Sequence, residues 1–138
     1  MLKGISPILP PELLKILMEM GHGDRIVISD GNFPAANCAK RLVRCDGHGV
    51  PEVLEGILRL FPLDTFVETP VNVMQTLDGS TPPIWAEFSR IVTEQERSME
   101  FGQIERFAFY EEAKKAYAIV STGEKALYAN IILQKGVL

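Results

Sequence analysis

Both histidines of this sequence lie between two glycines, in Gly21-His22-Gly23 and in Gly47-His48-Gly49. Small neighbours let a ligand approach an imidazole closely, and an unperturbed imidazole titrates at about pH 6.5, so such a histidine can transfer protons at neutral pH. The competing interpretation of His22 is an exposed residue in a glycine helix cap, which is the commoner case for an arbitrary sequence. Because the triplet occurs twice, it is no signature by itself, and we interpret His48 as an ordinary loop residue.

Asp30 is a carboxylate in a position where ligand sites are common. It directly follows Arg25-Ile26-Val27-Ile28-Ser29, a β-branched run that predicts a buried strand. Proteins of the α/β class bind ligands at the ends of such strands. The alternative is a structural role, in which Asp30 starts the turn through Asn32 or caps the next helix.

Tyr128 and Asn130 lie two residues apart in a segment that we interpret as a strand over residues 127–133. Side chains two apart on a strand share a face, so this pair is expected to present polar groups together. Ala129, Ile131 and Leu133 are then expected to face the core.

Arg106 precedes the aromatic segment Phe107-Ala108-Phe109-Tyr110. Its guanidinium could bind hydroxyl or carboxylate groups as a fork, although a surface salt bridge is the default for a single arginine. Trp85 could stack on a ligand, but its apolar neighbours at helical spacing favour a place in the core or at a subunit interface.

The elements that must position these residues alternate between helices and strands. Apolar periodicity, prolines and glycines predict helices over 11–20, 34–40, 51–61, 81–92 and 107–114, and strands over 25–29, 42–44, 65–68, 71–75, 116–121 and 127–133. This alternation is typical of an α/β fold with a largely parallel or mixed sheet. At 138 residues we expect one domain, spanning 1–138.

Composition excludes several classes of protein. The net charge is −4, and the 14 Lys and Arg residues form no basic stripe, so nucleic acid is an unexpected partner. No apolar run reaches the roughly 20 residues of a membrane span, and no secretory leader is visible. We expect a soluble, cytoplasmic protein with Cys38 and Cys45 as free thiols, no nucleotide or other cofactor, and no metal site.

Several separate segments, in one order from Met1 to Val137, together resemble the RbsD/FucU family of sugar mutarotases and pyranases. These segments are Leu2-Lys3-Gly4-Ile5-Ser6-Pro7, Glu19-Met20-Gly21-His22-Gly23-Asp24, Asp30-Gly31-Asn32-Phe33-Pro34, Arg106-Phe107-Ala108-Phe109-Tyr110-Glu111, Thr122-Gly123-Glu124 and Tyr128-Ala129-Asn130. The ribose pyranase branch typically has Thr in place of Gly23, lacks Phe33 and carries His in place of Tyr110. The resemblance is therefore closer to the fucose-type branch.

The resemblance implies an isomerase in a three-layer α/β/α fold with a mixed sheet, which acts on a free monosaccharide. His22 would be the catalytic proton donor, with Asp30 as its orienting partner or as an acceptor for a sugar hydroxyl. The sugar-binding residues would be Asp30, Arg106, Tyr110, Tyr128, Ala129 and Asn130, and Phe33 could form an apolar wall against the fucose methyl group. The family also implies a homo-oligomer, often a decamer of stacked pentameric rings, with sites near subunit boundaries.

Three alternatives remain open from the sequence. The first is a ribose pyranase or a broader aldose mutarotase, which would perform the same chemistry on another sugar. The second is a non-catalytic sugar-binding subunit, which would keep sugar affinity without accelerating anomer exchange. The third is a structural protein in which Gly-His-Gly only caps a helix.

Overall fold

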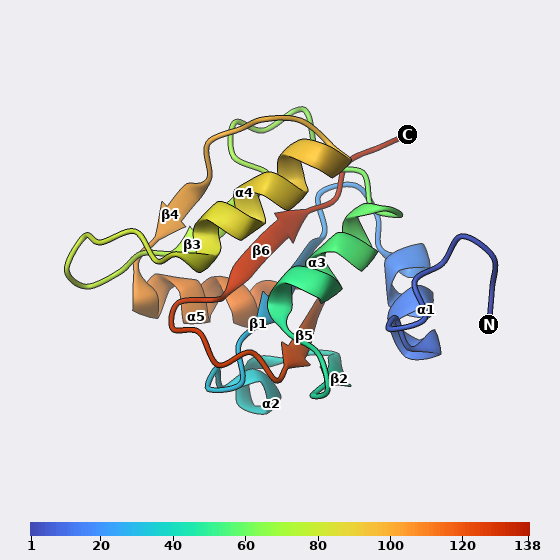
Figure 1. The fold of residues 1–138 in the computed structure, drawn as a ribbon, viewed down its shortest axis with the longest axis horizontal. Helices are drawn as coiled ribbons and strands as arrows, with labels where there is room; N and C mark the ends of the chain where they lie inside the picture. The colour runs from blue at the N-terminus through green and yellow to red at the C-terminus, as the bar shows by residue number, and fades with distance from the viewer.

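The computed structural model describes all 138 residues, and its strands form one six-stranded mixed sheet (Figure 1). The strands are β1 (Arg25–Ser29), β2 (Leu42–Cys45), β3 (Val71–Met74), β4 (Gly102–Ile104), β5 (Ala118–Thr122) and β6 (Ile131–Gln134). They lie in the order β2-β5-β1-β6-β3-β4. Only β6 runs against its neighbours, because it pairs antiparallel with β1 and β3 whereas all other pairs are parallel. The predicted mixed α/β sheet is confirmed.

Helices cover both faces of this sheet and make three layers. The helices are α1 (Pro11–Glu19), α2 (Ala35–Cys38), α3 (Val50–Leu58), α4 (Ile84–Gln95) and α5 (Arg106–Lys115). Side chains of α1, α3 and α4 pack on one face in the larger core cluster, and those of α2 and α5 pack on the other. Figure 1 shows α3 and α4 in front of the sheet and α5 behind it. No helix is both long and apolar enough to cross a membrane.

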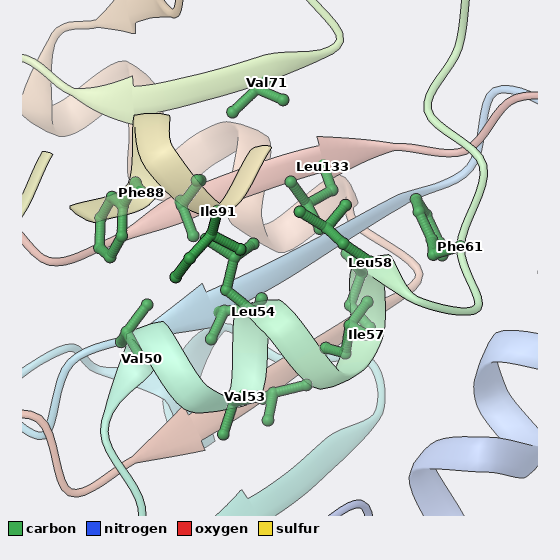
Figure 2. Close-up of a cluster of buried hydrophobic side chains, with 14 of the residues drawn as sticks. Val50, Val53, Leu54, Ile57, Leu58, Phe61, Val71, Phe88, Ile91 and Leu133 are labelled. Atoms are coloured by element: carbon green, nitrogen blue, oxygen red, sulfur yellow. The ribbon is translucent and has the colours of Figure 1, made fainter. Parts of the chain in front are cut away.

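Alternation along the strands produces the two cores. In β1, Ile26 and Ile28 point to the larger cluster and Val27 to the smaller one, and all three are fully buried. Figure 2 shows apolar side chains of α3, α4 and β6, among them Leu54 and Ile91, gathered in the larger cluster. Both faces of the central strands are therefore dry, and polar groups can gather only at the ends of the strands.

The predicted strand at 65–68 is wrong. Residues 65–68 are exposed and form bends. A side-chain oxygen of Asp64 accepts a hydrogen bond from the backbone N–H of Phe66 at 2.9 Å. This contact forms a local turn, which is incompatible with the extended backbone of a strand. β4 was not predicted because it has only three residues and no buried alternation.

The last strand begins at Ile131 and not at Leu127. Tyr128 has a φ of 58°, in the left-handed region, which strand residues do not adopt. The prediction that Tyr128 and Asn130 share one face of a strand is therefore wrong. The prediction that Ala129, Ile131 and Leu133 lie in the core is confirmed, because all three are fully buried in the larger cluster.

Ile131→Ala is expected to lower the free energy of unfolding by about 2–5 kcal/mol, because it leaves a cavity in a closed core. Ile131 is fully buried and is paired with Ile28 on one side and Val73 on the other. Urea unfolding followed by circular dichroism measures the change. Leu127→Ala is the control, since that side chain is exposed. Equal losses from the two variants would contradict this description of the core.

Candidate active site

Polar side chains gather at the edge of the sheet where the parallel strands end, which we call the carboxyl edge. β1 ends there at Ser29, and the antiparallel β6 begins there at Ile131. Ile28 is paired with Ile131, so the residues just after β1 lie beside those just before β6. This pairing places Asp30 next to Asn130, although 100 positions separate them in the sequence.

Asp30 and Asn130 form a reciprocal pair that is almost fully buried. The Asn130 side-chain oxygen accepts the backbone N–H of Asp30 at 2.9 Å, and Asn130 Nδ2 donates to Asp30 Oδ2 at 3.0 Å. Only 5% of Asp30 and 4% of Asn130 is exposed. Two residues far apart in sequence are thus held rigidly as one polar unit at the carboxyl edge.

The other carboxylate oxygen of Asp30 accepts the backbone N–H of Asn32 at 3.0 Å. Asp30 therefore does start the turn through Asn32, and this role is compatible with a place in a site. Burial raises the pKa of Asp30 above its usual value, while hydrogen bonds from Asn32 and Asn130 oppose that rise. A buried carboxyl group whose pKa is perturbed in this way is common at functional sites, so Asp30 stays a candidate site residue.

Arg106 and Tyr110 project from the first turns of α5, which starts at the carboxyl edge just after β4. Arg106 Nε donates to the Tyr110 hydroxyl at 3.1 Å, and the Tyr110 ring packs edge-on against Phe33, with 5.4 Å between ring centroids. Only 8% of Phe33 is exposed. Within one copy the Phe33 ring is thus largely covered, in part by Tyr110, and its role as an apolar wall against a ligand stays a prediction.

Tyr128 reaches the same edge through its unusual backbone. Its hydroxyl accepts the backbone N–H of Leu77 at 3.4 Å, and its carbonyl accepts the Trp85 indole N–H at 3.1 Å. The pKa of the Arg106 guanidinium is raised mainly by Tyr110 and, to a smaller degree, by Tyr128. Trp85 is buried in the core, as its helical spacing favoured, and Ala129 is buried beside it. Of the Tyr128-Ala129-Asn130 segment, Ala129 can contribute only backbone groups.

His22 lies at the opposite edge of the sheet. The whole of β1 separates His22 from Asp30, and its five residues alone span roughly 16 Å at about 3.3 Å per residue. The prediction that Asp30 orients His22 is therefore wrong within one copy of the chain. The carboxylate that contacts His22 is that of Asp64, whose oxygens lie 3.3 Å from His22 Nε2.

Asp64 is the candidate site residue that the sequence analysis missed. Its side chain is 2% exposed, whereas that of His22 is 46% exposed. The hydrogen bond from the Phe66 N–H is the main cause that lowers the pKa of Asp64, with further contributions from Gln134 and His22. No local signal marks Asp64, because only the crossing of the 62–66 segment with the end of β6 brings it to His22.

His48 lies in the turn before α3, as a loop residue. Its Nδ1 lies 3.2 Å from Glu52 Oε1, one turn away on α3, and its carbonyl accepts the Gly123 N–H at 2.9 Å. These contacts give His48 a structural role. No three His, Cys, Asp or Glu side chains group closely enough to hold a metal ion.

Comparisons with known proteins agree with this fold over its full length. A fucose mutarotase of Homo sapiens is 49% identical, over 99% of this chain and 94% of that protein. A fucose mutarotase from Streptococcus pneumoniae, solved in complex with L-fucose, superposes with a TM-score of 0.92 at 48% identity, over 99% of each chain. RbsD of Bacillus subtilis, solved with D-ribose, reaches a TM-score of 0.76 at 25% identity, over 100% of this chain and 99% of that one.

The family comparison covers nearly every residue. Residues 3–138 match the model of the RbsD / FucU transport protein family. This match includes both edges of the sheet, and hence His22, Asp30 and the segments around Arg106 and Tyr128. The chain belongs to the RbsD / FucU transport protein family.

Proposed function

We propose that this chain is an L-fucose mutarotase, an isomerase that interconverts the α and β anomers of free L-fucose. The observation that carries the proposal is the match, over 99% of both chains, to a mutarotase solved with L-fucose. The lower likeness to the ribose-bound RbsD favours fucose over ribose. A polar cluster at the carboxyl edge and an exposed histidine supported by a carboxylate are groups that this chemistry needs.

Mutarotation of a pyranose only moves protons and one C–O bond. A base takes the proton of the anomeric hydroxyl, the C1–O5 bond breaks with its electron pair on O5, and O5 receives a proton. The open aldehyde rotates about C1–C2 and recloses on either face by the reverse steps. A positioned acid or base contributes roughly 10²- to 10⁴-fold to such a reaction.

The carboxyl-edge cluster would bind the sugar. Asp30 would accept a hydroxyl, because its buried carboxylate is held in one orientation by Asn130 and Asn32. Arg106 is exposed, and its hydrogen bond to the Tyr110 hydroxyl orients the guanidinium. Its remaining N–H groups can therefore donate to hydroxyl oxygens. The proposed sugar-binding set is Asp30, Arg106, Tyr110, Tyr128, the backbone of Ala129, and Asn130.

We propose further that each site is built from two copies of the chain, with His22 of one copy facing Asp30 of the next. The length of β1 supports this arrangement, since His22 cannot approach Asp30 of its own copy. His22 also lines a groove of about 610 Å³ whose walls are mainly apolar and include the exposed Met18 and Val137. Exposed apolar surface of this kind supports a homo-oligomer, for which we propose the decamer of stacked pentameric rings that the resemblance implies.

The compartment is also a proposal. Cys38 and Cys45 are both buried free thiols, a state that suits the reducing cytoplasm. We therefore propose that the enzyme acts on free sugar in the cytoplasm.

Anomer exchange is expected to be faster for L-fucose than for D-ribose, and unchanged by a strong chelator. Fucose is expected to be preferred because the match to the fucose-bound relative is closer, and recognition of one methyl-sized group is worth roughly 10- to 200-fold. The chelator is expected to have no effect because the proposed mechanism moves only protons and one C–O bond. Saturation-transfer NMR at anomeric equilibrium measures both rates directly.

The rival functions give different results in the same experiment. Faster exchange of ribose would move the chain to the pyranase type, and sugar binding without exchange would identify a non-catalytic binding subunit. Activity lost to the chelator and restored by a divalent metal would overturn the proton-only mechanism.

A further inference from the structure

His22 and Asp64 make a contact between an exposed imidazole and a buried carboxylate. His22 Nε2 lies 3.3 Å from both Asp64 oxygens, and the imidazole also packs at 5.5 Å against the ring of Phe66. One nitrogen of the imidazole thus faces the carboxylate. The other, Nδ1, has no partner within the chain among its hydrogen bonds or ion pairs.

Hydrogen bonds from groups other than His22 hold the Asp64 carboxylate in place. Its Oδ1 accepts the Phe66 N–H at 2.9 Å, and its Oδ2 accepts Gln134 Nε2 at 2.9 Å. Gln134 in turn accepts Arg25 Nε at 3.1 Å, and Arg25 donates to Glu112 at 2.8 Å. This chain of contacts anchors the carboxylate to β1, β6 and α5, so Asp64 has little freedom to turn away from His22.

We propose that Asp64 is a positioning residue, which holds the proton of neutral His22 on Nε2 and leaves Nδ1 free to exchange protons with the sugar. The inference rests on the proposed mutarotase function and assigns a partner within the same copy to its catalytic histidine. An acceptor-only carboxylate favours the tautomer that places a proton on the nitrogen facing it. The carboxylate also stabilises the imidazolium that forms when Nδ1 takes the anomeric proton.

Protons and electron pairs balance in this step. Nδ1 takes the proton from the anomeric hydroxyl, the C1–O5 electron pair moves to O5, and the imidazolium returns its proton to O5. Asp64 neither gains nor loses a proton in this sequence. Two further charged groups lie in the segments around His22: Asp24, which accepts the Gly21 N–H, and Lys135, which lines the same groove and donates to the carbonyls of Leu17 and Met20.

The conservative variant Asp64→Asn distinguishes a purely structural role of Asp64 from the proposed positioning role. Asp64→Asn keeps a side-chain oxygen for the Phe66 N–H, so the local turn is preserved. It removes the negative charge and supplies an amide that can donate as well as accept. A turn-forming role tolerates this change, whereas a role in holding the His22 proton does not.

The experiment compares Asp64→Asn with Glu52→Gln, which makes the matched change in the other His–carboxylate pair of the chain. For Asp64→Asn we expect kcat for fucose exchange to fall roughly 10- to 100-fold with KM nearly unchanged, because proton transfer and not sugar contact is impaired. In ¹⁵N spectra of the sugar-free protein, the His22 ring should lose its single Nε2–H tautomer. Glu52→Gln should leave kcat and the His22 ring signals as in the wild type.

Gln134→Leu is a second variant, which keeps His22 and Asp64 but removes one donor to the carboxylate. We expect a smaller fall in kcat of the same kind. Wild-type kcat together with an unchanged His22 tautomer in Asp64→Asn would overturn the inference. If the wild type itself catalysed no exchange, the proposed function would fail, and the ring tautomer of the sugar-free protein would still decide whether Asp64 positions His22.

Discussion

Replacing His22 by alanine is expected to remove enzymatic anomer exchange, with a loss of roughly 10²- to 10⁴-fold, while the fold is kept. The loss follows from the removal of the group that would carry the proton in both directions. The fold is expected to survive because 46% of the His22 side chain is exposed and the residue lies outside every helix and strand. Saturation-transfer NMR on L-fucose measures the rate, and circular dichroism with thermal unfolding measures the fold.

His48→Ala is the matched control, since His48 is the other histidine between two glycines and also contacts a carboxylate. It should be nearly silent in the exchange assay, because Glu52 and the Gly123 N–H account for its contacts. Equal losses of activity from the two variants would count against His22 as the proton carrier. So would a loss of folding from His22→Ala alone.

Elements with a strong local pattern could be predicted from the sequence. The run Arg25–Ser29 is β1, and the stripe of Leu13, Ile16 and Leu17 is the buried face of α1. In both, burial repeats with the period of the element, so the local pattern and the packing agree. The mixed sheet followed from the alternation of such elements.

Elements decided by single side chains or by short pairings could not be predicted. The segment at 65–68 has strand-like residues, but the carboxylate of Asp64 binds the Phe66 N–H and turns the chain. Tyr128 adopts a left-handed φ that its residue type gives no reason to expect. At 65–68 a local side-chain hydrogen bond overrides strand propensity, whereas at Tyr128 a tertiary contact does so, because the Trp85 indole N–H binds the Tyr128 carbonyl.

The candidate site was predictable as a set of residues but not as an arrangement. Asp30, Arg106, Tyr110, Tyr128 and Asn130 could be named from motifs, and the structure brings them to one edge of the sheet. The partner of His22 could not be named, because the contact with Asp64 joins a loop before β1 to a segment 42 positions later. His22 and Asp30 are close in the sequence, which suggested that they contact each other. In the structure β1 lies between them and places them at opposite ends of the strand.

This separation leads to a test of the two-copy site by mixing inactive variants. His22→Ala lacks the proposed proton carrier but keeps an intact carboxyl edge, and Asp30→Asn lacks the buried carboxylate but keeps an intact His22. If each site takes His22 from one copy and Asp30 from another, random mixed oligomers contain some sites with both residues intact. Equal amounts of the two variants, unfolded together and refolded, should then recover roughly a quarter of wild-type exchange.

The control mixture distinguishes pairs that lie in one copy from pairs that lie in two. His22→Ala mixed with Asp64→Asn should recover almost nothing beyond the average of the separate variants, because His22 and Asp64 contact each other within one copy, 3.3 Å apart. Every site in that mixture carries either no imidazole or one beside an altered partner. Recovery with Asp30→Asn but not with Asp64→Asn would therefore show that the His22 and Asp30 of one site come from different copies of the chain. The absence of recovery in both mixtures, with mixed oligomers shown by native mass spectrometry, would mean that His22 and the carboxyl edge do not meet across copies.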